Sequence, residues 1–268
     1  MSPGAIFVQP HLDDVALSCG GVVGAAAANG ASPRVVTIFA GAPDLPAALG
    51  ALATRLHARW GLGDRPLEGR KLEDRAACAL LGAEPAWLAH TEALYRAGPT
   101  GPPALLRDLF ARPTASDDVL LARVIDDVRA VHQAFPEATF FFPLGVGGHA
   151  DHLLCQAAGA ALETHGAAVV YYEDFPYVTA PGEPLRQRLT ELAPDLQSRV
   201  IRVEPWFEAR LAASAAYRSQ LGTILGGRPL ADAARGWASA VAPGGLGERL
   251  WGSATALATL TRTLGPAA

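Results

Sequence analysis

Two short motifs of histidine and carboxylate residues each follow an apolar run with the composition of a buried strand. Pro10-His11-Leu12-Asp13-Asp14 closes the first run, and Gly148-His149-Ala150-Asp151-His152 follows a second one. His149 stands 138 positions after His11. In open parallel sheets, sites form where the strands end and loops lead into helices. The two motifs therefore predict a fold that brings two distant strand ends into one pocket.

The rest of the chain has the alternation that such a sheet requires. Short runs rich in Val, Ile and Phe alternate with longer helical patterns, which predicts an α/β fold, a Rossmann-like three-layer sandwich with a mostly parallel sheet. Strands are expected at Ala5–Gln9, Arg34–Ala40, Ala86–His90, Thr139–Phe142 and Ala168–Tyr172. Helices are expected near residues 15–29, 47–60, 70–82, 116–134 and 150–165.

After about residue 184 this alternation weakens. Val200–Val203 is expected to be a short strand and Phe207–Leu225 a helix, followed by Gly- and Pro-rich pieces. We expect one domain over residues 1–268, with a core at about 1–183 and a C-terminal cap at about 184–268.

Charge and composition narrow the class of partner. The net charge is −4, and no run of Lys or Arg is present, which argues against nucleic acid and against a polybasic membrane contact. Val15 to Pro33 is uncharged but too weakly apolar for a membrane span, and no signal peptide is evident. These features favour a small-molecule partner and a cytoplasmic location. They leave formation of a homo-oligomer open.

The two motifs have other interpretations besides a metal site. Asp13 and Asp14 could cap a helix, because carboxylates at a helix start accept its free N–H groups. Gly145-Val146-Gly147-Gly148-His149-Ala150 matches a loose dinucleotide-binding pattern, although it lies deep in the chain. Against these stands the joint occurrence of both motifs. His149 and His152 are three residues apart at a helix start, can share one face and could join a divalent-metal site.

The same residues carry a family resemblance. The first motif with Gly20-Gly21, together with His149-Ala150-Asp151-His152, resembles the zinc-dependent de-N-acetylases of the PIG-L/LmbE type. Arg70-Lys71-Leu72-Glu73 resembles a helix start of that family, and Tyr172-Glu173-Asp174-Phe175-Pro176-Tyr177 resembles one of its loops. The chain departs from the family at Leu12, where Pro is common, and at Val15, where Glu is common.

The resemblance implies one Zn²⁺ per chain, held by His11, Asp14 and His152. It also implies that Asp13 is the general base that takes a proton from zinc-bound water. From spacing alone, Asp13 and Asp14 cannot be told apart.

The other predicted roles concern the substrate. His149 is expected to stabilise the oxyanion as a positively charged donor, and Asp151 is expected to orient His149 and favour its charged form. The candidate substrate-binding residues are Arg70, Glu92, Tyr172 and Asp174.

The resemblance thus implies a hydrolase that removes the acetyl group from an N-acetylated amino sugar of the N-acetylglucosamine type. Two other functions remain open. One is metal-dependent hydrolysis of a phosphoester or carbamoyl group, and the other is metabolite binding without catalysis, with the metal as a structural clip.

Overall fold

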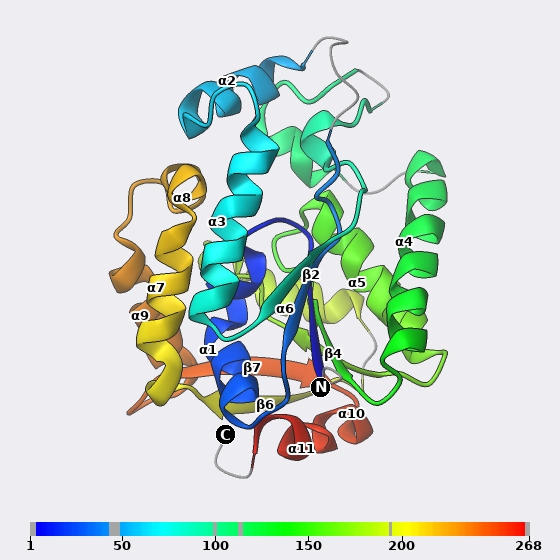
Figure 1. Ribbon diagram of the computed structural model, residues 1–268, viewed down its shortest axis with the longest axis vertical. Helices are drawn as coiled ribbons and strands as arrows, with labels where there is room; N and C mark the ends of the chain where they lie inside the picture. The colour runs from blue at the N-terminus through cyan, green and yellow to red at the C-terminus, as the bar shows by residue number, and fades with distance from the viewer. Residues whose placement is uncertain (1–3, 43–48, 99–100, 112–114, 193–194, 266–268) are drawn as a thin grey trace.

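A seven-stranded sheet forms the centre of the protein (Figure 1). The computed structural model describes residues 4–42, 49–98, 101–111, 115–192 and 195–265. The strand order is β3-β2-β1-β4-β5-β7-β6, in which the first five strands are parallel and the last two are antiparallel to their neighbours. The strands are β1 (Ala5–Gln9), β2 (Arg34–Thr37), β3 (Glu84–Trp87), β4 (Thr139–Pro143), β5 (Ala168–Tyr172), β6 (Gln197–Arg202) and β7 (Gly247–Gly252).

Helices cover both faces of the sheet. In Figure 1, α1 (Asp14–Ala28), α3 (Pro66–Leu80) and α7 (Phe207–Ala216) lie on one side, and α4 (Ala115–Ala134) and α5 (Ala150–Glu163) on the other. This confirms the predicted three-layer α/β architecture. The remaining helices are α2 (Ala51–Trp60), α6 (Pro184–Glu191), α8 (Arg218–Ile224), α9 (Leu230–Val241), α10 (Ala254–Ala258) and α11 (Leu260–Leu264), with 3₁₀ turns η1 (Ala93–Tyr95), η2 (Leu106–Phe110), η3 (Tyr177–Thr179) and η4 (Glu204–Trp206). The predicted helix 47–60 starts among residues 43–48, which lie outside the described residues.

The order in which successive strands join the sheet reverses at β1, which pairs with β2 on one side and β4 on the other. The connection after β1 leads outward to β2, whereas the chain returns through α4 to reach β4. At such a switch point a crevice opens beyond the carboxyl ends of the two central strands. Both motifs leave the sheet at this crevice.

Two separate hydrophobic clusters hold this arrangement. The strands β1 and β4 are buried along their whole length, and the rings of Phe7 and Phe141 stack with centroids 4.3 Å apart. A second cluster lies above the carboxyl edge of the sheet, at the top of Figure 1, and joins α2 to the segment around residues 93–109. It contains Leu52, Ala53, Leu56, Trp60, Ala93, Leu94 and Leu109.

The C-terminal region differs from the predicted cap. It adds β6 and β7 to the sheet, and α7 packs on α1, so this region shares the central sheet with the rest of the chain. The sequence of β7 hid this role because Glu248, a buried strand residue, is charged. Glu248 accepts hydrogen bonds from Gly21 N and Val22 N, at 2.9 and 2.7 Å, and pairs with the buried Arg210. The single-domain interpretation stays a prediction.

The helix expected over residues 207–225 is also two helices. It breaks at Tyr217, between α7 and α8, and the Tyr217 hydroxyl donates to Asp74 at 2.8 Å. This break turns α8 toward the crevice.

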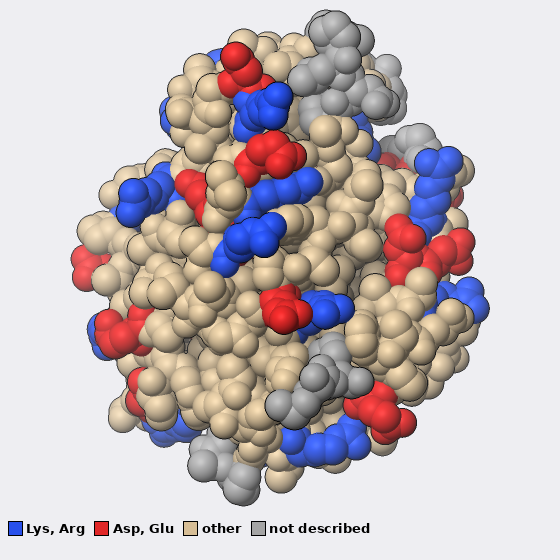
Figure 2. All heavy atoms as spheres, in the orientation of Figure 1, with Lys and Arg blue, Asp and Glu red and all other residues tan. Residues whose placement is uncertain are grey.

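On the face shown in Figure 2, basic and acidic side chains are interspersed and no continuous basic patch forms. Within the described ranges, none of the helices has both the length and the hydropathy needed to cross a bilayer. The cytoplasmic location and the absence of a nucleic-acid partner stay predictions.

Candidate active site

The first motif turns directly from β1 into α1. Asp13 occupies the N-cap position, but its side chain makes no capping hydrogen bond. Instead, Gln9 Oε1 accepts from Val15 N at 3.0 Å, and the Asp14 carboxylate accepts from His11 N at 2.7 Å. The helix-cap alternative for Asp13 is therefore wrong, and its carboxylate is free for the cavity.

A buried polar network holds this turn from below. Gln9 Nε2 donates to Thr37 Oγ1 and to Asp74 Oδ1, at 2.9 and 3.0 Å. Asp74 also accepts from Trp87 and Tyr217. Burial raises the pKa of Asp74, although these hydrogen bonds act in the opposite direction. Because buried polar groups are costly when unpaired, this satisfied network fixes the backbone that carries the motif.

The second motif starts α5 with His149 as the N-cap residue. His149 Nδ1 accepts a hydrogen bond from Asp151 N at 3.2 Å, so the other ring nitrogen carries the proton in the neutral imidazole. Gly147 has a φ of +87°, and a Cβ there would lie 2.7 Å from Tyr177 Cβ. The glycine therefore lets Tyr177 lie against the motif.

The two motifs meet, as predicted. The ring centroids of His11 and His152 are 5.3 Å apart. The Asp14 carboxylate lies between them, with Oδ2 3.3 Å from His11 Nδ1 and Oδ1 3.4 Å from His152 Nε2. His149 belongs to the same cluster, since one ligand atom from each of the three histidines lies within 4.8 Å of the others.

The donor set fits a divalent metal ion. His11 Nε2 donates to Asp151 Oδ2 at 2.9 Å, and His152 Nδ1 donates to Asp174 Oδ1 at 2.7 Å, so a carboxylate fixes the outer nitrogen of each ring. His152 Nε2 is buried and has no hydrogen-bond partner among the residues that the structure describes. Carboxylate-backed histidines whose free nitrogens face a further carboxylate are typical of zinc sites. A buried nitrogen without a partner also calls for a ligand.

The carboxylates of the first motif have opposite electrostatic environments. Burial acts to raise the pKa of Asp14, but His152 and His11 outweigh it and hold that pKa at about 2. Burial and the negative charge of Asp14 raise the pKa of Asp13 to about 7. One carboxylate is thus suited to remain an anionic ligand and its neighbour to exchange a proton near neutral pH.

The role predicted for Asp151 is wrong in one respect. Its carboxylate does not orient His149 but accepts from His11 Nε2, from Ala93 N at 2.8 Å and from Arg96 Nη1 at 2.6 Å. Burial and the positive charge of His11 lower the pKa of His149 well below its usual value. In this structure the charged form predicted for His149 from the sequence is therefore disfavoured.

Two of the four predicted substrate-binding residues line the cavity. Arg70 and Glu92 are buried at its edge and form an ion pair, with Arg70 Nη1 2.8 Å from Glu92 Oε1. The Arg70 guanidinium lies over the Trp60 ring, 4.9 Å from its centroid, and Arg70 Nε has no hydrogen-bond partner in the described part of the chain. Arg70 lies in the second turn of α3, which begins at Pro66 and not at Arg70 as predicted.

The other two predicted substrate contacts are wrong, because both side chains lie behind the site. The Tyr172 hydroxyl donates to Val8 O at 2.9 Å and is buried in the sheet. Asp174 is fully buried, and its second oxygen accepts from Val146 N at 2.8 Å. Asp174 therefore supports His152 and does not touch a ligand in the cavity.

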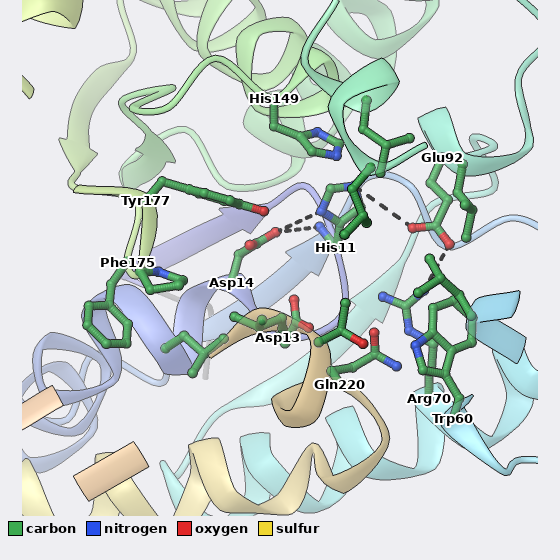
Figure 3. Close-up of a pocket in the computed structure, with 18 of the residues that line it drawn as sticks. His11, Asp13, Asp14, Trp60, Arg70, Glu92, His149, Phe175, Tyr177 and Gln220 are labelled. Atoms are coloured by element: carbon green, nitrogen blue, oxygen red, sulfur yellow. Dashed lines mark hydrogen bonds and ion pairs between the residues drawn. The ribbon is translucent and has the colours of Figure 1, made fainter. Parts of the chain in front are cut away.

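A cavity of about 190 Å³ lies at this site (Figure 3). We call its charged part the floor, consisting of His11, Asp13, Asp14, Arg70, Glu92 and His149. We call six of its apolar lining residues the wall, namely Leu56, Leu94, Leu106, Leu109, Phe110 and Ile224.

The sequence did not indicate the wall, Trp60 or Gln220, which also line the cavity. Tyr177 was noted only as part of a loop. Its hydroxyl points toward Asp14 (Figure 3) and makes no hydrogen bond with the described residues. Its position after β5, the neighbour of β4, was the one available signal.

Comparison with known proteins agrees with this geometry. The family model described as "PIG-L: GlcNAc-PI de-N-acetylase" matches residues 6–163. A 2'-N-acetylparomamine deacetylase of Niallia circulans is 29% identical over 234 residues, covering 82% of each chain. The crystal structure of a deacetylase-bog complex from the biosynthesis pathway of teicoplanin is 30% identical with a TM-score of 0.80, covering 92% of this chain and 96% of the other. The zinc-inhibited form of a teicoplanin deacetylase is 29% identical with a TM-score of 0.79 and the same coverage.

Proposed function

The chain belongs to the PIG-L family of de-N-acetylases and is a hydrolytic N-deacetylase, and we propose that it uses zinc to release acetate from an N-acetylated amino sugar of the N-acetylglucosamine type. The observation that carries this proposal is the convergence of His11, Asp14 and His152 beside the free carboxylate of Asp13. Amide hydrolysis needs an activated water, a base, and donors for the oxyanion, and the floor offers residues suited to each.

His11, Asp14 and His152 would hold the metal. When bound, Zn²⁺ acidifies a water molecule and polarises a carbonyl group. The chain itself keeps the two imidazoles in the required orientation through Asp151 and Asp174. This arrangement leaves His11 Nδ1 and His152 Nε2 as the ligand atoms.

Asp13 is the general base. Its carboxylate lines the cavity beside Asp14 and takes no part in capping α1. It accepts the proton of the attacking water and returns it to the amine as the carbon–nitrogen bond breaks. The oxygen of the water thereby ends in acetate, and its proton ends on the amine of the free amino sugar.

His149 of the floor and the neighbouring Tyr177 would supply hydrogen-bond donors to the substrate. The protonated nitrogen of His149 and the Tyr177 hydroxyl are the hydrogen-bond donors available there, because His149 Nδ1 is engaged by Asp151 N. Both would donate to the substrate oxygen as it gains negative charge. Donors fixed in place before the reaction stabilise that charge without reorganisation.

Arg70 and Glu92 would bind the hydroxyl groups of the sugar. Their ion pair holds both side chains at the cavity, and Arg70 Nε still lacks a hydrogen-bond partner. A ring hydroxyl that reaches this pair can accept from Arg70 and donate to Glu92.

The test combines metal analysis of the purified protein with acetate-release and phosphate-release assays on N-acetylglucosamine conjugates and phosphoesters. We expect about one zinc per chain and release of acetate. His152→Ala should lose both with the fold intact by circular dichroism, whereas the exposed His165→Ala should keep both. Full zinc content in His152→Ala, or release of phosphate and not acetate, would overturn the proposal.

A further inference from the structure

The wall is a surface that the hydrolytic steps above do not use. It presents aliphatic and phenyl carbon to the cavity. Leu106 and Phe110 of the wall are 47% and 38% exposed. Large apolar side chains left exposed beside a cavity are typical of a ligand-binding surface.

The wall also has its own support. Leu56, Leu94 and Leu109 belong to the second hydrophobic cluster, which is separate from the core around the sheet. Ile224 approaches from α8 and packs against the core around the sheet. Leu106 and Phe110 belong to neither cluster among the described residues, so their exposed carbon is not used in the packing of either one.

The charges of the cavity limit what this surface can accept. Among the described lining residues the carboxylates are Asp13, Asp14 and Glu92, and all three belong to the floor. Among the residues that the structure describes, the one arginine in the lining is Arg70, which is already paired with Glu92. A charged group placed against the wall would lose its hydration without gaining a counter-ion, which is costly.

Two described charged residues near the wall, Arg55 and Asp108, are engaged elsewhere. Arg55 Nη2 donates to Ala104 O. Asp108 accepts from Ala104 N and Leu105 N, at 2.9 and 2.8 Å, and lies 3.9 Å from Arg107. These groups hold the η2 turn and do not line the cavity among the described residues.

From the exposed carbon of the wall and its lack of free charge, we propose that the amino sugar is joined to an uncharged apolar group, an aryl or alkyl aglycone, which binds against the wall. The proposal rests on the proposed function for the position of the sugar. Phe110 connects the two parts, because its ring lies edge-on to His149 and Tyr177, with centroids 5.3 and 5.7 Å away. An aglycone attached to a sugar at the floor would therefore lie within reach of Phe110, and Leu106 lines the same cavity.

Two neighbouring leucines provide a matched pair of variants. Leu106 lines the cavity and is 47% exposed, whereas Leu105 is 45% exposed and is not among the lining residues. Leu106→Glu and Leu105→Glu add the same charge at similar exposure on the same turn. Only the first places it on the wall.

The kinetic test compares acetate release from phenyl N-acetylglucosaminide, free N-acetylglucosamine, and N-acetylglucosamine joined to a diaminocyclitol. We expect kcat/KM at least about tenfold higher for the phenyl conjugate than for the other two. Leu106→Glu should abolish most of that advantage, while Leu105→Glu, outside the cavity lining, should change kcat/KM for none of the three substrates. A preference for the cationic conjugate, or an unchanged advantage in Leu106→Glu, would overturn the proposal.

A binding measurement separates this proposal from the hydrolytic one. Calorimetry with phenyl glucosaminide, the deacetylated sugar, needs no turnover. We expect about tenfold weaker binding to Leu106→Glu than to the wild type and unchanged binding to Leu105→Glu. Selective binding without acetate release would support the wall and contradict the proposed hydrolysis. Acetate release with equal binding to all three proteins would contradict the wall alone.

Discussion

The floor and the wall of the cavity are built in different ways. The polar side chains of the floor are held by other buried polar groups, as His11 is by Asp151 and Arg70 by Glu92. In the wall, Leu56, Leu94 and Leu109 pack within a cluster apart from the main core, Ile224 packs against the main core, and Leu106 and Phe110 stay exposed.

This difference in construction suits the floor to catalysis and the wall to substrate recognition. Reacting groups must keep distances within a fraction of an ångström, which hydrogen-bonded networks in a rigid sheet provide. An apolar surface discriminates by area and by lack of charge, so it tolerates looser geometry. Changes in the floor should therefore affect turnover strongly, whereas changes in the wall should affect the choice of substrate.

The largest effect is expected for Asp13→Asn. An amide cannot accept the proton of the attacking water, so kcat should fall by about 10² to 10⁴, while zinc content stays near the wild-type value. Steady-state acetate release and metal analysis check this, with the exposed Asp64→Asn as control. If Asp13→Asn kept more than a tenth of the wild-type kcat, the base would have to be another residue.

Arg96→Gln should weaken zinc binding by about 10- to 100-fold, the usual effect of losing an outer partner of a metal ligand. Arg96 holds Asp151, and Asp151 holds His11 Nε2, so the substitution loosens a ligand that it does not touch. Chelator competition measures the affinity without turnover. Arg34→Gln removes an exposed ion pair as the control, and equal affinity in both variants would contradict this chain of contacts.

Tyr177→Phe should lower kcat by about tenfold and leave KM nearly unchanged, because the ring packing remains and only a donor to the developing charge is lost. Tyr171→Phe, which removes a hydroxyl bonded to Glu163 away from the cavity, is the matched control. A rise in KM with constant kcat would instead assign Tyr177 to the recognition side of the comparison.

The smallest effect concerns a carboxylate outside both regions. Burial raises the pKa of Glu173 to about 7, against the hydrogen bonds from Arg249 and Trp251. The folded state therefore holds its proton more tightly than the unfolded state. Its contribution to stability falls as pH rises from about 4.5 to about 7 and is constant above that, with a total of up to about 3 kcal/mol.

Glu173→Gln removes this titration, so its melting temperature should fall by about 5 °C less than that of the wild type between pH 5 and pH 8. Thermal denaturation at the two pH values checks it. The exposed Glu84→Gln should behave as the wild type. A parallel decline in Glu173→Gln would show that other groups set the pH dependence.

The central strands were predictable because their signal is local. Continuous apolar runs gave Ala5–Gln9 and Ala168–Tyr172 their observed bounds. The edge strand β3 begins at Glu84 rather than Ala86, since it takes its register from pairing with β2, where Arg34 lies opposite Glu84. Pairing of this kind is a tertiary property.

The same distinction applies to the site. The residue types and spacing of the two motifs identified the chemistry, because few structures other than a shared metal site need histidines and carboxylates at both strand exits. The hydrogen-bond partner of each side chain could not be predicted from the sequence. The wrong roles predicted for Asp151, Tyr172 and Asp174 show this. Within a few residues of a strand end, small rotations decide which side chain enters the cavity.

By itself the sequence determined that the chain forms a mostly parallel sheet with two chemically matched strand exits, because periodicity and residue type act over a few neighbours. Only the tertiary structure decided that Asp151 supports His11, that β6 and β7 complete the sheet, and that α2, η2 and α8 join into an apolar wall. The physical reason is that these contacts depend on how elements distant in sequence pack together. The sequence pattern around a leucine in an amphipathic segment does not specify which other segment it packs against.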